Sequence, residues 1–135
     1  MSGRVRLALA AFLLLAVLCG MILVAFAGNT CATDLPAAPC PEAGRNRGVV
    51  VALLGLTTWL LVVPFAFLAE FALRRRIVYR GIWGRAMRRG FLAGLAMAAV
   101  SGLRLGGALS VPAVLFLVIM VGLVEWFAIR RVDLP

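Results

Sequence analysis

Four long apolar runs alternate with short polar segments along the chain. They cover residues 7–27, 49–73, 91–109 and 111–129, and each is apolar on nearly every helical face. A helix needs about 20 such residues to cross the ~30 Å hydrocarbon core of a membrane. Helices that are apolar on all sides are typical of membrane spans rather than of soluble cores. The pattern predicts an all-α fold, an integral membrane four-helix bundle that forms one domain over residues 1–135.

The connections between these runs differ sharply in character. Residues 28–48 are polar and contain three prolines, whereas residues 74–90 are densely basic. Only a tight turn around Ser110 separates the third and fourth runs, and Pro112 stands in the first turn of the last helix, where proline is tolerated. We therefore expect one loop of moderate length at each end of the bundle, and a short turn between the last two helices.

Arginine placement predicts the orientation of the chain. Two arginines precede the first run, seven lie in the basic loop and two follow the fourth run, whereas only Arg45 and Arg47 lie in the 28–48 loop. Loops rich in arginine stay on the cytoplasmic side of a membrane. The sequence predicts that both termini and the 74–90 loop are cytoplasmic, and that residues 28–48 form an outer loop.

The first run leaves one alternative open. Arg4 and Arg6 followed by an apolar run and Ala25-Phe26-Ala27 are also the pattern of a cleavable signal peptide. The run covers residues 7–27, which is longer than the ~7–15 apolar residues of such peptides. We favour a retained span.

Composition narrows the class of protein. The chain is 64% hydrophobic and 14% charged, with a mean hydropathy of +1.10, which excludes a soluble enzyme, a disordered tail or a secreted disulfide-rich domain. The net charge of +9 comes from arginines grouped in topogenic loops, so we expect no nucleic-acid partner. The absence of lysine is typical of a GC-rich genome, and we expect the plasma (inner) membrane of a prokaryote. The absence of histidine removes the usual haem and metal ligand, and we expect no cofactor and no metal site.

Two of the three cysteines lie in the predicted outer loop. Cys31 and Cys40 are nine positions apart on the oxidising side of the membrane, where nearby cysteines usually pair. A redox-active pair normally shows the C-x-x-C spacing, which is absent, so we favour a structural disulfide. Cys19 lies in the first run and is interpreted as a small apolar residue.

Small residues recur every fourth position along the third run. This helix-packing stripe consists of Gly90, Gly94, Ala98, Gly102 and Gly106. Such a stripe lets two helix backbones approach closely. Two alternatives remain open: the stripe packs within this chain, or it forms an interface with a partner or a second copy.

The basic segment before the third run has an amphipathic pattern. Its predicted contacts with lipid headgroups involve Arg80, Arg85, Arg88, Arg89 and Trp83. A basic helix with an aromatic anchor suits the anionic inner leaflet of the membrane. Because Gly90 lies at nearly the same helical azimuth as Trp83, the segment can equally be an extension of the third helix.

Three ionisable residues lie in or near the spans and are candidates for function, since burying a charge in lipid is costly. Glu70 stands four residues before Arg74, so an ion pair at the membrane interface can explain it. Glu125 lies within the fourth run, where Arg88 or Arg89 can reach it. Arg104 lies deep in the third run, where it can extend toward the outer surface or pair with Asp34 or Glu42.

No catalytic motif or placed carboxylate pair occurs in the chain, and an enzyme is not favoured. The sequence points to a small non-enzymatic membrane protein, an accessory, structural or assembly subunit that packs against a partner through the third helix. The partner is another membrane protein or a second copy. The alternative is a small oligomeric transporter or channel that uses Arg104 as an anion site and Glu125 as a coupling carboxylate.

Overall fold

The chain folds into four helices joined by short connections. The computed structural model describes residues 3–31, 37, 39–73 and 79–130, with the side chains of Tyr79 and Arg80 outside the description. The helices are α1 (Gly3–Asn29), α2 (Ala43–Leu73), α3 (Tyr79–Leu105) and α4 (Val111–Arg130). The described residues contain no strand, and the predicted all-α fold is confirmed.

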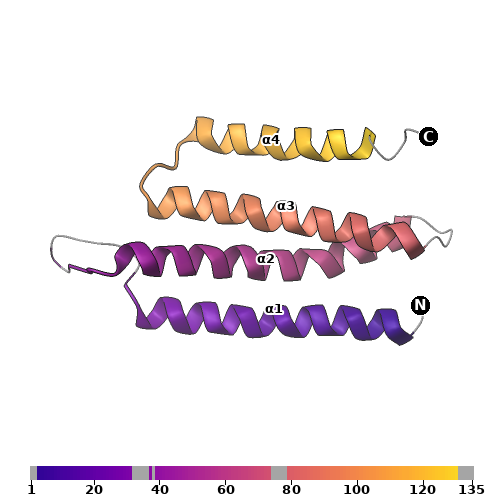
Figure 1. Ribbon diagram of the computed structural model, residues 1–135, viewed down its shortest axis with the longest axis horizontal. Helices are drawn as coiled ribbons and strands as arrows, with labels where there is room; N and C mark the ends of the chain where they lie inside the picture. The colour runs from indigo at the N-terminus through magenta and orange to yellow at the C-terminus, as the bar shows by residue number, and fades with distance from the viewer. Residues whose placement is uncertain (1–2, 32–36, 38, 74–78, 131–135) are drawn as a thin grey trace.

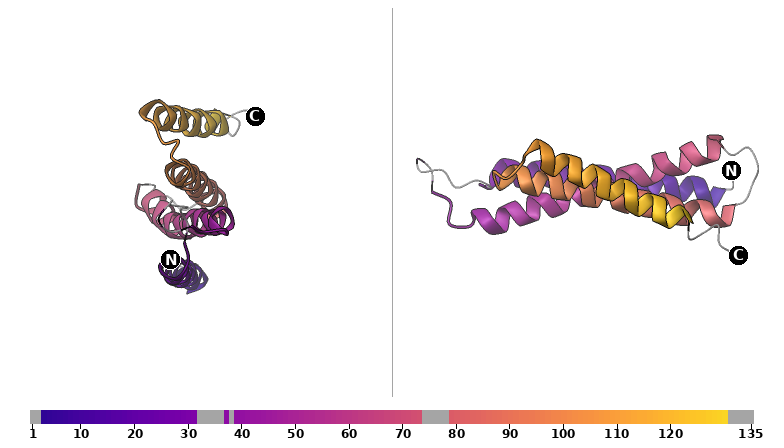
Figure 2. Two further views of the ribbon diagram at one scale, coloured as in Figure 1. Left: turned by 90° about the vertical axis from the view of Figure 1, so that its left-hand side faces the viewer. Right: turned by 90° about the horizontal axis from the view of Figure 1, so that it is seen from above.

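Consecutive helices run in opposite directions and lie side by side in chain order (Figure 1). Seen end-on, they stack as a layer in which α2 and α3 are central and α1 and α4 form opposite edges (Figure 2). The most extensive contact between helices joins α2 and α3. The last helix, α4, contacts α3 alone among the described helices, and this contact is small. The start of α1 and the end of α4 lie at the same end of the layer as the end of α2 and the start of α3 (Figure 1). We call this the basic end, and the opposite end, which holds the 30–42 connection, the disulfide end.

Three helices, α1, α2 and α4, are long and apolar enough to cross a membrane. The third helix carries more charge, and its longest uncharged run, between Arg89 and Arg104, covers residues 90–103. That run is about 21 Å of helix, shorter than the ~30 Å of a hydrocarbon core. The apolar character of the chain is thus concentrated in the other three helices.

The hydrophobic core lies toward the basic end. It is formed by Leu9, Phe67, Ile82 and Ala86, which come from α1, α2 and α3. Trp83 packs on this core, with its ring centroid 4.7 Å from that of Phe67 and 5.9 Å from that of Phe12. Apolar side chains of α1, α2 and α3 therefore pack together at the level of the basic segment, which contributes Ile82 and Ala86.

The third helix begins and ends differently from the predicted 91–109 run. It begins at Tyr79, so the basic segment extends this helix, one of the two alternatives. It ends at Leu105, because Gly107 adopts a positive φ of 72°. The Gly107 amide then donates to the Arg104 carbonyl (3.1 Å), and the Ala108 amide to the Leu103 carbonyl (2.9 Å). This is a Schellman cap, and it places Gly106 outside the helix.

Candidate functional site

A group of ion pairs joins α2, α3 and α4 near the basic end. We call Glu70, Arg85, Arg88, Arg89 and Glu125 the charge cluster. Glu70, on α2, is the most deeply buried member, with 8% of its side chain exposed. It accepts hydrogen bonds from Arg85 Nε at 3.1 and 3.2 Å and from Arg89 Nη1 at 2.9 Å. Two charge-assisted donors thus satisfy a carboxylate that would otherwise be costly to bury.

Glu125 extends the cluster to α4. Its Oε1 accepts a hydrogen bond from Arg89 Nε at 2.8 Å, and Arg88 Nη2 lies 4.0 Å from the same oxygen. Arg89 therefore bridges the two glutamates, one from each neighbouring helix. Because α4 makes few other contacts and has no buried residue, this bridge is its main polar attachment to the layer.

The charges of the cluster do not balance. Three arginines face two carboxylates, and Arg89 and Arg85 make the close hydrogen bonds. Arg88 has only the 4.0 Å approach to Glu125, and its buried Nε has no hydrogen-bond partner. The cluster thus holds one positive charge in excess, centred on Arg88.

These contacts refine the predicted roles of the charged residues. Glu70 pairs across helices with Arg85 and Arg89, whereas the expected partner Arg74 lies outside the described residues. Glu125 has the predicted neighbours, Arg88 and Arg89. Of the arginines that were predicted to contact headgroups, Arg85 and Arg89 are thereby engaged with carboxylates inside the fold.

Trp83, the predicted headgroup anchor, packs against neighbouring helices in this fold. Its ring lies between Phe67 and Phe12, which belong to α2 and α1. The apolar face of the basic segment, with Ile82 and Ala86 buried, therefore packs on neighbouring helices, and the contact of Trp83 with headgroups stays a prediction. The side chain of Arg80, the remaining member of the predicted headgroup set, lies outside the description.

Arg104 lies far from the cluster. It is exposed near the disulfide end of α3, 15 residues beyond Arg89, which is about 22 Å along a helix. It forms no ion pair with any described residue; Glu42 is bound by Arg45, and Asp34 lies outside the description. Since Glu125 is held by Arg89 at the other end, Arg104 and Glu125 share no site.

The small-residue stripe of α3 faces α2 over part of its length. A Cβ placed on Gly94 would lie 2.6 Å from the Gly55 carbonyl oxygen, and one on Gly90 would lie 2.5 Å from Val63 Cγ2. The contact loosens toward the disulfide end, where a Cβ on Gly102 would be 3.9 Å from Val51. The face at Gly90 and Gly94 is thus occupied within this chain.

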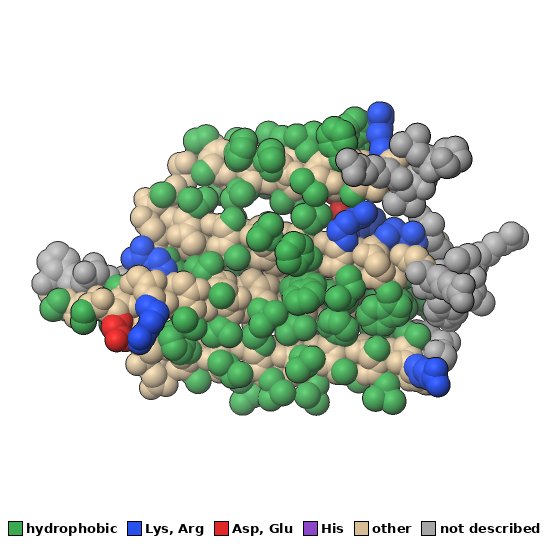
Figure 3. All heavy atoms as spheres, in the orientation of Figure 1, with side chains coloured by type: hydrophobic (Ala, Val, Ile, Leu, Met, Phe, Trp, Pro, Cys, Tyr) green, Lys and Arg blue, Asp and Glu red, His purple; other side chains and the backbone are tan. Residues whose placement is uncertain are grey.

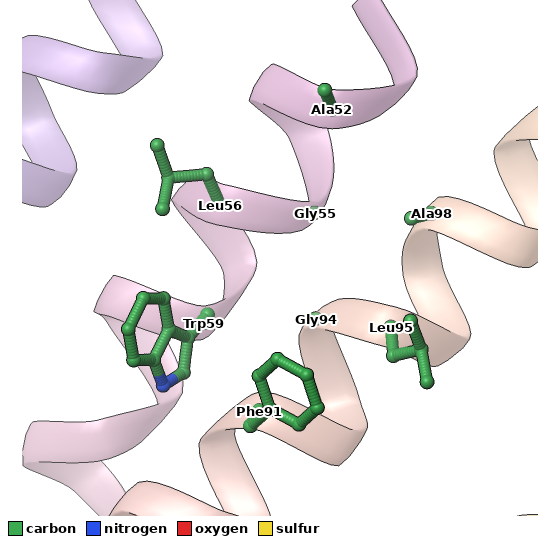
Figure 4. Close-up of a pocket in the computed structure, with 8 residues that line it drawn as sticks. All are labelled: Ala52, Gly55, Leu56, Trp59, Phe91, Gly94, Leu95 and Ala98. Atoms are coloured by element: carbon green, nitrogen blue, oxygen red, sulfur yellow. The ribbon is translucent and has the colours of Figure 1, made fainter. Parts of the chain in front are cut away.

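An apolar groove runs beside this contact, between α2 and α3. It has a volume of about 290 Å³. Its lining comprises Ala52, Gly55, Leu56, Trp59, Phe91, Gly94, Leu95 and Ala98, with Trp59 and Phe91 on facing sides (Figure 4). The two rings meet edge to face with their centroids 6.3 Å apart. We call this the α2–α3 groove.

The two cysteines near the disulfide end lie at disulfide distance, with their Cα atoms 6.2 Å apart. The Cys31 carbonyl also accepts a hydrogen bond from Asn46 Nδ2 at 2.9 Å, so the connection is tied to the first turns of α2. Cys19 is buried in α1, and its thiol faces the Leu53 carbonyl at 3.8 Å. The cysteines therefore join α1 and α2 at one end of the layer.

The charge cluster is suited to structure rather than to chemistry. Both carboxylates are bound to arginines, and no group of three His, Cys, Asp or Glu residues that could hold a metal occurs in the described part of the chain. The cross-helix pairing of Glu70 could not be read from the sequence, because 15 and 19 residues separate it from its partners. Comparison with known proteins gives no family model, curated protein or solved structure that matches the chain.

Proposed function

We propose that the protein is a non-enzymatic accessory or assembly subunit of a membrane complex, and that a partner helix docks in the α2–α3 groove. The observation that carries this proposal is the engagement of both intramembrane glutamates by arginines of the same chain. A coupling carboxylate must exchange protons or ions, and Glu70 and Glu125 are instead held in fixed pairs. Their separation from Arg104 also leaves the alternative transport role without a common site.

The α2–α3 groove supports the choice of a helix as the occupant. Its floor lies where α2 and α3 meet at the small residues Gly55, Gly94 and Ala98, so side chains of an added helix have room above them. Its rim has exposed large side chains, including Phe91 and Leu95. No charged residue lines it, so the partner segment must be apolar as well. A transmembrane helix of another membrane protein has these properties.

The test is native mass spectrometry of the protein purified gently from its own membrane. Leu56 and Leu13 form a matched pair, since they are 41% and 40% exposed but only Leu56 lines the groove. We expect a partner subunit in fixed stoichiometry. Leu56→Ala should lower the affinity for this partner about tenfold, as for a contact residue of an interface, whereas Leu13→Ala should leave it unchanged.

Two outcomes would contradict this function. Recovery of a homo-oligomer without another subunit would favour the transporter or channel alternative. Equal retention of the partner by both leucine variants would show that the groove is not the docking surface.

A further inference from the structure

A second groove lies between α3 and α4. Three adjoining hollows of about 370, 240 and 180 Å³ follow the two helices from the charge cluster toward the disulfide end. Leu92 and Val121 line both the first and the second hollow, and Ala96 and Leu117 line both the second and the third. The hollows therefore form one elongated α3–α4 groove, which is open in the space-filling view (Figure 3).

The groove has one charged end and an apolar remainder. Arg89 and Glu125 line its first hollow, whereas every residue that lines the other two hollows is apolar. Small side chains such as Ala96 and Ala99 face the larger Leu117 and Met120 across it. A narrow, elongated apolar space of this kind suits a hydrocarbon chain, and its charged end suits a polar head.

Arg88, next to the paired Arg89 and Glu125 that line the charged end, favours an anion there. Arg88 lies beside Glu125, has 31% of its side chain exposed, and is the member of the charge cluster without a close carboxylate. On the adjoining turns of α4, the Arg130 guanidinium lies 4.2 Å from the Trp126 ring centroid. Tryptophan and arginine together are typical of the headgroup level of a membrane. An excess positive charge at that level attracts anionic lipid.

We propose that the α3–α4 groove binds an anionic phospholipid, with one acyl chain between α3 and α4 and the phosphate against the Arg88 guanidinium. The phosphate offsets the excess charge of the cluster and accepts hydrogen bonds from the exposed part of the Arg88 side chain. The acyl chain fills the space that α4 leaves because its side chains do not interdigitate fully with α3. The lipid thus completes the attachment of α4, at a site whose lining shares Leu95 with the α2–α3 groove.

The experiment measures lipid binding to the delipidated full chain in detergent by native mass spectrometry. The probes are phosphatidylglycerol, phosphatidylcholine with the same acyl chains, and inorganic phosphate. We expect one phosphatidylglycerol per chain, bound in preference to phosphatidylcholine and not displaced by excess phosphate. The preference reflects the charge at Arg88, and the resistance to phosphate reflects the buried acyl chain.

Two variants test the two halves of the site. Arg88→Gln removes one interfacial positive charge and should weaken phosphatidylglycerol binding about fivefold. Ala96→Phe fills the groove away from the charges and should weaken binding more than tenfold. The controls are Arg104→Gln, which removes an exposed arginine from the other end of α3, and Ala11→Phe, which enlarges an exposed position of α1. Both controls should bind as the unaltered chain does.

Four outcomes would overturn the proposal. Equal binding of the two phospholipids would show that headgroup charge does not determine the preference. Displacement of the lipid by inorganic phosphate would indicate a site for free anions. Equal weakening by Arg88→Gln and Arg104→Gln would indicate general attraction to a basic protein. A lipid-free dimer that Ala96→Phe dissociates would show that a second copy occupies the groove.

Discussion

Gly94 of α3 faces the backbone of Gly55 of α2 so closely that a Cβ on Gly94 would lie 2.6 Å from the Gly55 carbonyl oxygen. Real Cβ atoms do not come this near a backbone oxygen, so any larger residue must push the two helices apart. The most extensive helix contact of the protein therefore depends on the absence of a single methyl group.

Gly94→Ala should lower the stability of the fold by about 1–3 kcal/mol, the cost of overpacking a close contact. Gly102→Ala is the matched control on the same helix and stripe, because a Cβ there meets only Val51 at 3.9 Å. We expect Gly102→Ala to be neutral or slightly stabilising, since alanine favours helix more than glycine does. Thermal unfolding followed by circular dichroism in detergent compares the two. Equal effects would mean that the stripe does not set the distance between α2 and α3.

Glu70→Gln should destabilise the fold by about 3 kcal/mol, because it leaves Arg85 and Arg89 without their shared buried carboxylate. Glu42→Gln is the control, since the Glu42–Arg45 pair is exposed and such pairs contribute about 0–1 kcal/mol. The midpoint of denaturant unfolding measures both changes. A stability loss no larger for Glu70→Gln than for Glu42→Gln would show that the cluster does not hold the helices together.

Trp83→Ala should cost about 2–3 kcal/mol, because it removes the ring that packs between Phe67 and Phe12. Trp126→Ala serves as the comparison, since 47% of Trp126 is exposed and it lies on the lightly packed α4. We expect less than half the effect there. If Trp126→Ala is the more damaging substitution in detergent, Trp83 is not a core residue.

Thiol labelling of the denatured, unreduced chain should modify Cys19 and leave Cys31 and Cys40 unmodified. Reduction should expose all three thiols. The closed loop of about 10 residues should contribute about 2–3 kcal/mol by restricting the unfolded chain. Replacement of Cys31 and Cys40 by serine together measures that contribution. Labelling of three thiols before reduction would contradict the pairing.

A topology reporter should give a cytoplasmic signal at Pro135 and an external signal at Gly107. The fold places the start of α1 and the end of α4 at one end of the layer (Figure 1), and the arginines of the sequence there predict which side of the membrane that end faces. Because α2 and α4 run in the same direction, α3 has to carry the chain back between them. An external signal at Pro135 would contradict the predicted orientation, and a cytoplasmic one at Gly107 would contradict a crossing by α3.

Much of the helical framework could be predicted from the sequence. In an apolar run of membrane length, the backbone N–H and C=O groups must bond to each other, and a helix satisfies all of them. The structure departs from the predicted run at the C-terminal end of α3. Gly106 and Gly107 are the signal for the Schellman cap, but they were interpreted as part of the stripe and of the apolar run. The basic segment was ambiguous because its apolar face suits a headgroup layer as well as a neighbouring helix.

The sequence by itself determined what is local: helices at the apolar runs, the nearby cysteine pair and the uneven distribution of arginine. These follow from hydropathy, spacing and charge within short stretches of chain. Only the tertiary structure decided that Glu70 binds Arg85 and Arg89, that Trp83 packs on Phe67, and that Gly94 meets Gly55. Those partners are set by the rotation and register of one helix against another. A helix that is apolar on nearly every face carries no pattern that fixes either quantity, so side-chain packing has to determine both.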